Sequence, residues 1–241
     1  MTLRLTATTA VLDIEGTTGA AGYVHGELYD YARPRLGPWI DAHSGDPDVA
    51  TAVEQTKTDA GLPGDAGTDA VVAALHAWMD GDVKATPLKT LQGQIWAAGY
   101  AAGELSSHFF DDVVPQLRSW HGRGVHLAVF SSGSVASQVP WFRHAPAGDL
   151  TPLVDAYFDT VSAGPKREAA SYDAIAAALG RAPGELLFLS DLPAELHAAR
   201  EAGWQVVGVR RDGEPNAAAD FGDLTVVASF DELEVDAAVA A

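Results

Sequence analysis

The second half of the sequence alternates short apolar runs with alanine-rich amphipathic segments. The apolar runs, most of them rich in β-branched residues, predict buried strands at 125–130, 186–189, 205–209 and 224–227. The amphipathic segments between them predict helices at about 135–144, 168–179 and 194–202. Strands and helices that alternate in this way form a parallel sheet with helices on both faces. The sequence therefore predicts a doubly wound, Rossmann-like α/β core, which binds ligands at the carboxyl ends of its strands.

A further apolar run, from Thr9 to Leu12, leads into Asp13, and Glu15 follows two residues later. Side chains two apart along a strand lie on the same side, and the Gly-Thr-Thr turn after Glu15 frees the backbone just beyond. Two such carboxylates suit a nucleophile, a nearby acid or base and a hard metal ion. Aspartate also favours turns in general, so this segment by itself fits an ordinary strand end equally well.

The stretch from Gly19 to His108 follows a different pattern. It shows no convincing strand, and its apolar spacing predicts helices at about 27–43, 48–60, 68–79 and 88–101. We therefore expect a helical domain of residues 19–108, inserted after the first strand into a core domain of residues 1–18 and 109–241. The alanine-rich tail after Glu234 is expected to be a fraying helix.

The composition excludes several kinds of chemistry. Of the 241 residues, 33 are acidic and 15 are basic, and the formal net charge of −18 disfavours nucleic-acid binding. The absence of cysteine rules out disulfides, zinc–thiolate sites and cysteine catalysis. The N-terminal residues lack a signal-peptide pattern, and no apolar run approaches the ~20 residues of a membrane span. We therefore expect a cytoplasmic protein that does not act at a membrane.

Hydroxyl groups follow the strand expected at 125–130. Ser131, Ser132 and Gly133 form a turn that enters the next predicted helix. Such a turn presents hydroxyls and backbone N–H groups, which bind phosphate well. An ordinary helix cap by Ser132 or Ser134 explains the same residues, so the turn alone does not decide between the two interpretations.

A lysine and an aspartate occupy the remaining strand ends. Lys166 lies just before a predicted helix and can neutralise a phosphoryl group; the alternative is a solvated surface lysine. Asp191 follows a fully apolar strand, with Glu195 four residues further on. Asp191 can complete a magnesium site with Asp13, or it can serve as the N-cap of the next helix. The order of all these residues on one expected sheet carries more weight than any one of them.

This order of motifs, Asp-x-Glu, Ser-Ser-Gly, Lys and Asp, resembles the haloacid dehalogenase superfamily of phosphohydrolases. Most phosphatases of that superfamily have aspartate at the position of Glu15. Glutamate there, in the run Asp-Ile-Glu-Gly-Thr-Thr, resembles one branch, the enolase-phosphatases (acireductone synthases) of methionine salvage. The resemblance runs over nearly the whole chain, through residues 31–33, 86–93, 157–160, 166–172 and 188–191. It implies that the helical insertion is a cap on the α/β core.

The sequence departs from the family pattern at three places. Residues Gly19 to Tyr23 stand where the family has Thr-Pro-Ile-Ser-Phe, Ser106 stands where it generally has lysine, and Arg143 replaces a glycine. The first two departures lie where the expected cap meets the substrate. They therefore bear on substrate affinity more than on the phosphatase chemistry.

The resemblance implies a role for each carboxylate. Asp13 would attack phosphorus and form an aspartyl-phosphate. Glu15 would protonate the leaving oxygen and then activate water. One Mg²⁺ per subunit would be held by Asp13, by Asp191 and by the main-chain carbonyl of Glu15.

The implied reaction enolises 2,3-diketo-5-methylthiopentyl-1-phosphate and then dephosphorylates it to the acireductone 1,2-dihydroxy-5-(methylthio)pent-1-en-3-one. Ser131 and Ser132 would hold the phosphoryl oxygens, and Lys166 would balance their charge. The cap would close over the substrate and exclude water, with Tyr23 and Trp96 near its apolar tail. Both Glu15 and residues of the cap are candidates for the enolisation base. We expect a monomer whose partner is this small phosphate ester.

Three other functions compete with this interpretation. A magnesium-dependent phosphatase of another small phosphate ester would use the same catalytic residues. A hydrolytic dehalogenase would use the Asp13 nucleophile without a metal and would not need Glu15 or Asp191. A non-catalytic binding module would have kept the fold alone, although every expected catalytic position carries a competent side chain.

Overall fold

A computed structural model of the chain describes residues 2–81 and 83–238. The chain divides into two compact units, one formed by the residues up to Gly22 together with those from Ser107 onward, the other by Tyr23–Ser106. The expected catalytic, phosphate-binding and metal-binding residues all belong to the first unit, whereas Tyr23 and Trp96 belong to the second.

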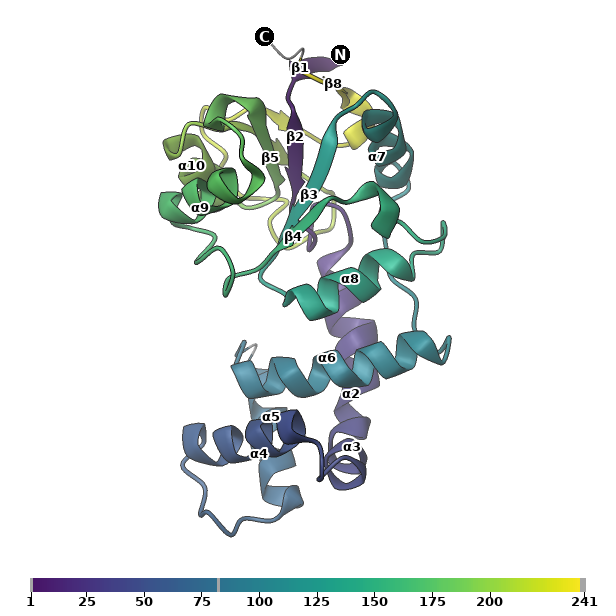
Figure 1. Ribbon diagram of the computed structural model, residues 1–241, viewed down its shortest axis with the longest axis vertical. Helices are drawn as coiled ribbons and strands as arrows, with labels where there is room; N and C mark the ends of the chain where they lie inside the picture. The colour runs from purple at the N-terminus through teal and green to yellow at the C-terminus, as the bar shows by residue number, and fades with distance from the viewer. Residues whose placement is uncertain (1, 82, 239–241) are drawn as a thin grey trace. The chain divides into compact units, whose positions relative to one another are not determined.

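Within the described residues, a parallel sheet of six strands forms the centre of the first unit (Figure 1). Its strands lie in the order β4-β3-β2-β5-β6-β7, and each neighbouring pair is parallel. The strands are β2 (Thr9–Leu12), β3 (His126–Phe130), β4 (Ala156–Phe158), β5 (Leu186–Ser190), β6 (Gln205–Val209) and β7 (Val226–Val227). This strand order confirms the doubly wound, Rossmann-like α/β fold.

The order of the strands reverses between β2 and β5. The chain leads from β2 to β3 on one side, whereas it leads from β5 to β6 on the other side. Leu12 at the end of β2 is level with Leu189 of β5, so Asp13 and Asp191 follow neighbouring strand ends. Open α/β sheets bind their ligands at such a switch point.

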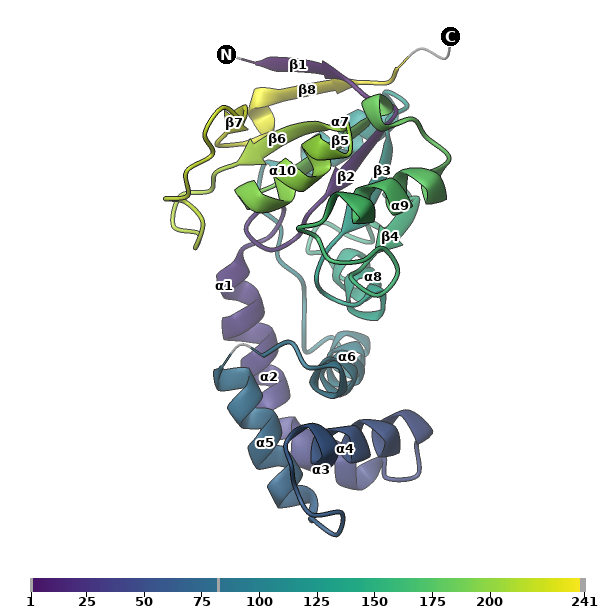
Figure 2. The ribbon, with the colours of Figure 1, turned by 90° about the vertical axis from the view of Figure 1, so that its left-hand side faces the viewer.

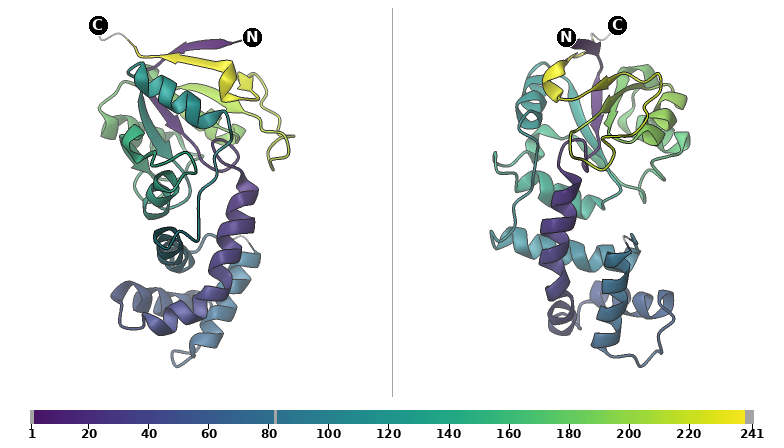
Figure 3. Two further views of the ribbon diagram at one scale, coloured as in Figure 1. Left: turned by 90° about the vertical axis from the view of Figure 1, so that its right-hand side faces the viewer. Right: turned by 180° about the vertical axis from the view of Figure 1, so that it is seen from behind.

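Helices cover both faces of the sheet. α9 (Ala169–Leu179) and α10 (Pro193–Glu201) lie on one face, and α7 (Val113–Gly122) lies on the other (Figures 1 and 3). α8 (Val135–Arg143) packs beside β4. Every residue of β2 and of β5 is buried, as expected for strands that are covered on both faces.

An aromatic cluster forms the core between the sheet and α9. Phe130 of β3, Phe188 of β5 and Tyr172 of α9 are fully buried. The Tyr172 ring meets both phenylalanine rings edge to face, at centroid distances of 5.6 and 5.2 Å. This packing fixes the ends of β3 and β5, which carry candidate site residues.

The two ends of the described chain pair with each other. β1 (Leu3–Thr6) and β8 (Leu233–Asp236) form a separate parallel pair (Figure 2). The helix expected after Glu234 is therefore wrong for this segment, because Leu233 and Val235 alternate with more exposed residues in the two-residue period of a strand. The last residues of that tail, 239–241, lie outside the described residues. The N-terminal residues likewise form a strand of their own before β2.

Two short strands differ from the sequence-based expectation. The sequence pattern does not reveal β4, because three residues show no measurable periodicity. β7 begins at Val226 instead of Leu224, since the Leu224 N–H donates to the Phe221 carbonyl in a turn. The other predicted strands and helices of the first unit agree with the observed ones to within about two residues, the usual uncertainty of such boundaries.

The regular elements of the second unit, in its described residues 23–81 and 83–106, are all helical (Figures 1 and 2). Helical turns begin with α1 (Ala21–Tyr23) and continue through a π-helical turn (Val24–Tyr29), α2 (Asp30–Ala32), a 3₁₀ turn (Arg33–Arg35) and α3 (Leu36–Ala42). Three longer helices follow: α4 (Pro47–Asp59), α5 (Thr68–Asp80) and α6 (Thr86–Ala101). Among the described residues, no helix combines the length and the apolar character needed to cross a bilayer.

A buried ion pair supports the turn that follows β2. The Arg211 guanidinium lies 2.7 Å from the Asp112 carboxylate and donates two hydrogen bonds of 3.2 Å to the Thr17 carbonyl. Asp112 also accepts hydrogen bonds from the Ser229 hydroxyl and the Phe230 N–H. Burial alone would raise the pKa of Asp112. The hydrogen bonds, of which that from Arg211 is the strongest, hold this pKa below its ordinary value.

We expect Asp112→Ala to destabilise the chain by about 3–5 kcal/mol, because it leaves the buried Arg211 guanidinium without its carboxylate. Urea unfolding followed by circular dichroism at neutral pH measures the change. The matched control is Asp111→Ala at the exposed neighbouring residue, which should alter the free energy of unfolding by less than about 0.5 kcal/mol.

The same ion pair predicts a pH dependence. The pKa of Asp112 is lower in the folded chain than its ordinary value of 3.8. The contribution of Asp112 to the free energy of unfolding is therefore complete above pH 3.8 and is lost as the pH falls through the pKa of the folded chain. The stability difference between wild type and Asp112→Asn should therefore be largest near neutral pH and shrink below about pH 4. A difference that stays constant from neutral to acidic pH contradicts this role of Asp112.

Candidate active site

Asp13 lies just past the end of β2, where the chain turns. Its N–H donates to the Leu189 carbonyl at 3.0 Å, and the Ile14 carbonyl then accepts from the N–H groups of Thr17, Thr18 and Gly19. Gly16 adopts a φ of 76°, a left-handed conformation that favours glycine. Since β2 ends at Leu12, residues 13–15 belong to this turn, and strand alternation does not determine the direction of Glu15.

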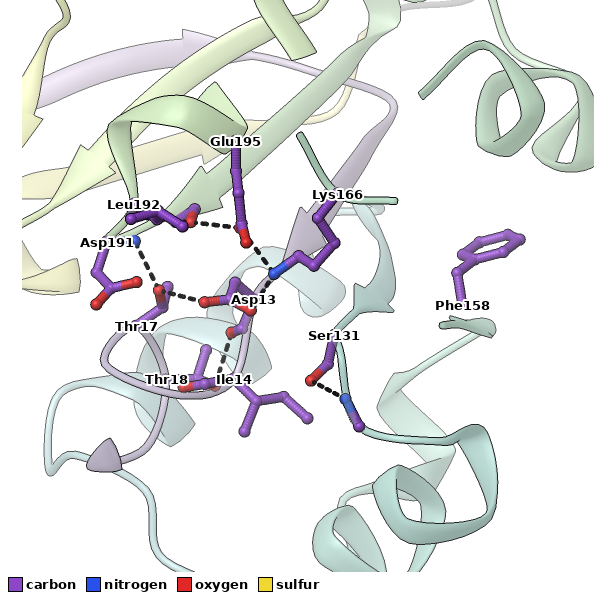
Figure 4. Close-up of polar contacts among 12 residues, drawn as sticks. Asp13, Ile14, Thr17, Thr18, Ser131, Phe158, Lys166, Asp191, Leu192 and Glu195 are labelled. Atoms are coloured by element: carbon purple, nitrogen blue, oxygen red, sulfur yellow. Dashed lines mark hydrogen bonds and ion pairs between the residues drawn. The ribbon is translucent and has the colours of Figure 1, made fainter. Parts of the chain in front are cut away.

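The Asp13 carboxylate is buried and held from both sides (Figure 4). The Lys166 Nζ lies 2.5 Å from its Oδ1, and the Thr17 hydroxyl donates to its Oδ2 at 3.0 Å. The Thr18 hydroxyl donates to the Asp13 carbonyl at 2.9 Å. These contacts fix the direction of the carboxylate, which is the geometry that a nucleophile needs.

Lys166 is buried between two carboxylates and is not a solvated surface lysine. Its Nζ lies 2.7 Å from the Glu195 Oε2 as well as 2.5 Å from Asp13. Burial disfavours the charged ammonium, but Asp13 and then Glu195 outweigh it and raise the pKa of Lys166 above its ordinary value. Lys166 is therefore a permanent positive charge at the end of the central strands.

Glu195 is a site residue to which the sequence analysis assigns no role. Its Oε2 accepts a hydrogen bond of 2.9 Å from the Ser190 hydroxyl and contacts Lys166 (Figure 4). Burial raises the pKa of Glu195 above its ordinary value, although Lys166 opposes this. The available signal is its position on the first turn of α10, directly after the strand end that carries Asp191.

The Asp191 carboxylate lies beside the turn that contains Asp13. The Asp191 backbone N–H donates to the Thr17 hydroxyl at 2.9 Å, and the carboxylate Oδ2 accepts from the Asn216 side chain at 2.9 Å. A Cβ at Gly16 would lie 2.2 Å from this Oδ2, so the carboxylate packs against bare backbone. Burial, and then the neighbouring Asp13 carboxylate, raise the pKa of Asp191 to about 7.

The helix-cap interpretations do not describe these strand ends. The N-cap of α10 is Leu192, and no side chain caps this helix, so Asp191 is not its cap. The N-cap position of α8 is Ser134, which makes no side-chain cap hydrogen bond. Asp159 accepts a hydrogen bond from the Val135 N–H of that helix instead, at 3.0 Å. Neither Asp191 nor Ser134 therefore caps a helix through its side chain.

Ser131, Ser132 and Glu15 lie on the turns around this cluster. Ser131 is buried at the end of β3, directly beside β2, and its hydroxyl accepts from the Gly133 N–H at 3.2 Å. Ser132 is exposed. Glu15 is half-buried, and its backbone pairs with Gly19. The structure thus joins Asp13, Lys166 and Asp191 in one hydrogen-bonded cluster, and Ser131, Ser132 and Glu15 lie on the adjoining turns.

The donor set fits a small, hard cation only in part. Asp13 and Asp191 offer carboxylate oxygens from neighbouring strand ends, which suits Mg²⁺. No group of three or more His, Asp or Glu side chains within the described residues is arranged to hold a metal ion. A magnesium site here therefore needs further oxygen ligands, from the main chain, from water or from a phosphate group.

The fold is shared with hydrolases of known structure. A HAD phosphatase from Thermococcus onnurineus is 15% identical with a TM-score of 0.58, over 91% of this chain and 93% of its own. The L-2-haloacid dehalogenase from Xanthobacter autotrophicus is 19% identical with a TM-score of 0.52, over 90% of this chain and 85% of its own. At such identities the likeness concerns the fold alone. The class that it defines is the haloacid dehalogenase-like α/β fold.

Relatives of higher identity narrow this class to one family. Enolase-phosphatase E1 from Saccharopolyspora erythraea is 59% identical over 237 residues, 98% of this chain and 99% of its own length. The protein of the same name from Streptomyces avermitilis is 56% identical over 225 residues, 93% of this chain and 94% of its own. The chain therefore belongs to the enolase-phosphatase E1 family.

A solved structure of higher identity shares the fold over most of the chain. The UTR4 protein from Saccharomyces cerevisiae is 29% identical with a TM-score of 0.77, over 93% of this chain and 98% of its own. A scan against protein-family models finds no match.

We expect Gly16→Ala to lower the activity of the enzyme by about tenfold or more, because a Cβ at residue 16 displaces the Asp191 carboxylate. Phosphate release from an aryl phosphate, with a thermal melt of the same sample, measures the effect. Gly180→Ala is the matched control: Gly180 also has a positive φ, of 63°, but has no atom within 4 Å of the added Cβ. It should lose stability but keep its activity. Equal activities of the two variants would contradict the close approach of Gly16 to Asp191.

Proposed function

We propose that this chain is a bifunctional enolase-phosphatase of methionine salvage. It converts 2,3-diketo-5-methylthiopentyl-1-phosphate to the acireductone 1,2-dihydroxy-5-(methylthio)pent-1-en-3-one and phosphate. The observation that carries the chemistry is the buried Asp13 carboxylate at the end of the central strand, 2.5 Å from the Lys166 ammonium. Membership of the enolase-phosphatase E1 family supports the choice of this reaction.

In this proposal the phosphoryl group is transferred first to Asp13 and then to water. Asp13 attacks phosphorus and forms an aspartyl-phosphate, while the bond from phosphorus to the enol oxygen breaks. Glu15 donates a proton to the departing oxygen and then accepts one from the water that hydrolyses the aspartyl-phosphate. Lys166 stays protonated and offsets the negative charge that gathers on the phosphoryl oxygens.

We further propose one bound Mg²⁺, held by the Asp13 and Asp191 carboxylates and by the main-chain carbonyl of Glu15. Two buried carboxylates on neighbouring strand ends favour a divalent cation, and the nearby Lys166 is already shared with Glu195. Mg²⁺ commonly keeps several water ligands in addition to a few protein oxygens, so this small donor set is sufficient. When bound, the ion neutralises charge on the phosphoryl oxygens.

The phosphate and the remainder of the substrate are proposed to bind to different parts of the chain. Ser131 and Ser132 hold the phosphoryl oxygens through their hydroxyls and through the N–H groups of their turn. The helical unit Tyr23–Ser106 acts as the cap that selects the substrate, with Tyr23 and Trp96 as candidates for contact with the apolar methylthio tail. We propose that the enzyme works in the cytoplasm as a monomer.

The proposed reaction is tested by adding the diketo phosphate and following enol absorbance and free phosphate together. Both should appear in sequence, EDTA should abolish phosphate release, and added Mg²⁺ should restore it. A faster turnover of another small phosphate ester would favour a general phosphatase. Phosphate release that is insensitive to EDTA would contradict the metal assignment.

We expect Asp13→Asn to reduce phosphate release to less than a few per cent of wild type, because an amide is a poor nucleophile. The matched control is Asp173→Asn, the same substitution at an exposed residue of α9, which should leave the rate unchanged. Thermal melts show whether both variants are folded. Substantial turnover by folded Asp13→Asn rules out the covalent role of Asp13.

A further inference from the structure

Side chains of the connection between β6 and β7 contact several other parts of the first unit. Arg211 donates to the Thr17 carbonyl, and Glu214 accepts a hydrogen bond of 2.8 Å from the Ala21 N–H. Asn216 donates from Nδ2 to the Asp191 Oδ2 at 2.9 Å. No sequence motif singles out this connection, yet it contacts both the turn after Asp13 and the Asp191 carboxylate.

The backbone of this connection holds Asn216 in a defined position. The Glu214 N–H donates to the Arg211 carbonyl, and the Ala217 N–H donates to the Glu214 carbonyl. The Asn216 carbonyl accepts from the Ala219 N–H at 2.9 Å. Arg211, at the start of these turns, is anchored by its buried ion pair with Asp112. Asn216 therefore extends its side chain from a sequence of turns that is fixed to the core.

The Asp191 carboxylate needs such a partner to hold one orientation. Rotation of an aspartate carboxylate about its last torsion is weakly restricted, so its orientation depends on outside contacts. One oxygen, Oδ2, lies against Gly16 and accepts from Asn216. Within the described residues, no hydrogen bond reaches the other oxygen, Oδ1. Asn216 thus occupies one oxygen and leaves the second available to a ligand.

We propose that Asn216 is a positioning residue, which orients the Asp191 carboxylate for binding of a divalent cation. This inference rests on the proposed function, in which Asp191 is a ligand of Mg²⁺. Residues that hydrogen-bond a metal ligand typically change metal affinity by about 10–100-fold when they are replaced. Asn216 is half-exposed on a surface connection, so its replacement leaves the buried core intact.

Calorimetric titration of the full chain with MgCl₂, without substrate, tests this role directly. Asn216→Ala should raise the Kd for Mg²⁺ by about tenfold or more. Asn216→Leu, which keeps the volume but removes the donor, should do the same. The matched control is Asp212→Ala, at an exposed residue of the same connection, whose Kd should stay within about twofold of wild type. Asp191→Ala shows the loss of affinity when the ligand itself is removed.

A kinetic and a thermal measurement separate positioning from a structural role. At saturating Mg²⁺, Asn216→Ala should keep the wild-type KM for its phosphate ester, whereas the Mg²⁺ concentration that gives half the maximal rate rises. The melting temperature of the variant in EDTA should stay close to that of wild type. A lowered melting temperature with an unchanged Kd for Mg²⁺ overturns the inference.

The outcomes also separate this inference from the function on which it rests. If wild type binds Mg²⁺, Asp191→Ala loses it and both Asn216 variants bind as wild type does, the role of Asn216 is wrong and the proposed function stands. If wild type binds no Mg²⁺, or Asp191→Ala binds it as tightly, the metal assignment fails and the inference fails with it.

Discussion

The register between β2 and β5 is the constraint on which the site depends. Because Leu12 is level with Leu189, the two strands end within one residue of the same level, and Asp13 and Asp191 follow at neighbouring strand ends. The Thr17 hydroxyl spans this gap, since it donates to one residue and accepts from the other. The register itself is set by packing on both faces, because a slip of one residue would exchange the side chains that pack against the two helical layers.

The charges around Lys166 are better explained by the proposed chemistry than by stability. An ammonium buried between Asp13 and Glu195 loses most of its hydration, and the attraction of two carboxylates compensates for this loss. Such clusters often contribute little to the free energy of unfolding. The proposed role of Asp13 as a nucleophile requires a fixed, charged carboxylate, and this requirement explains the cluster better than stability does. Removal of either carboxylate would leave the remaining charges poorly balanced in a buried environment.

Hydrophobic periodicity and strand-end residues were enough to predict the α/β core and the cluster of Asp13, Lys166 and Asp191. Both signals depend on residues that are close in sequence, or on a rule that applies to every parallel sheet. β4 and the pairing of β1 with β8 were not predictable, because three or four residues carry little pattern and their partners are distant. Asn216 was missed for a related reason: its contact with Asp191 depends on the conformation of a connection that has no regular period.

The contacts of Asp112 link segments that are far apart in the sequence. Asp112 accepts from Ser229 and Phe230 near the end of the chain, and its partner Arg211 supports the Thr17 carbonyl near the beginning. Local opening of proteins occurs in cooperative groups of contacts that share such links. The segment around Ser229 and Phe230 and the turn after Asp13 should therefore exchange their amide hydrogens as one unit. Local opening around Phe230 should thus reach the turn that holds the Asp13 carboxylate, although the two segments are far apart in the sequence.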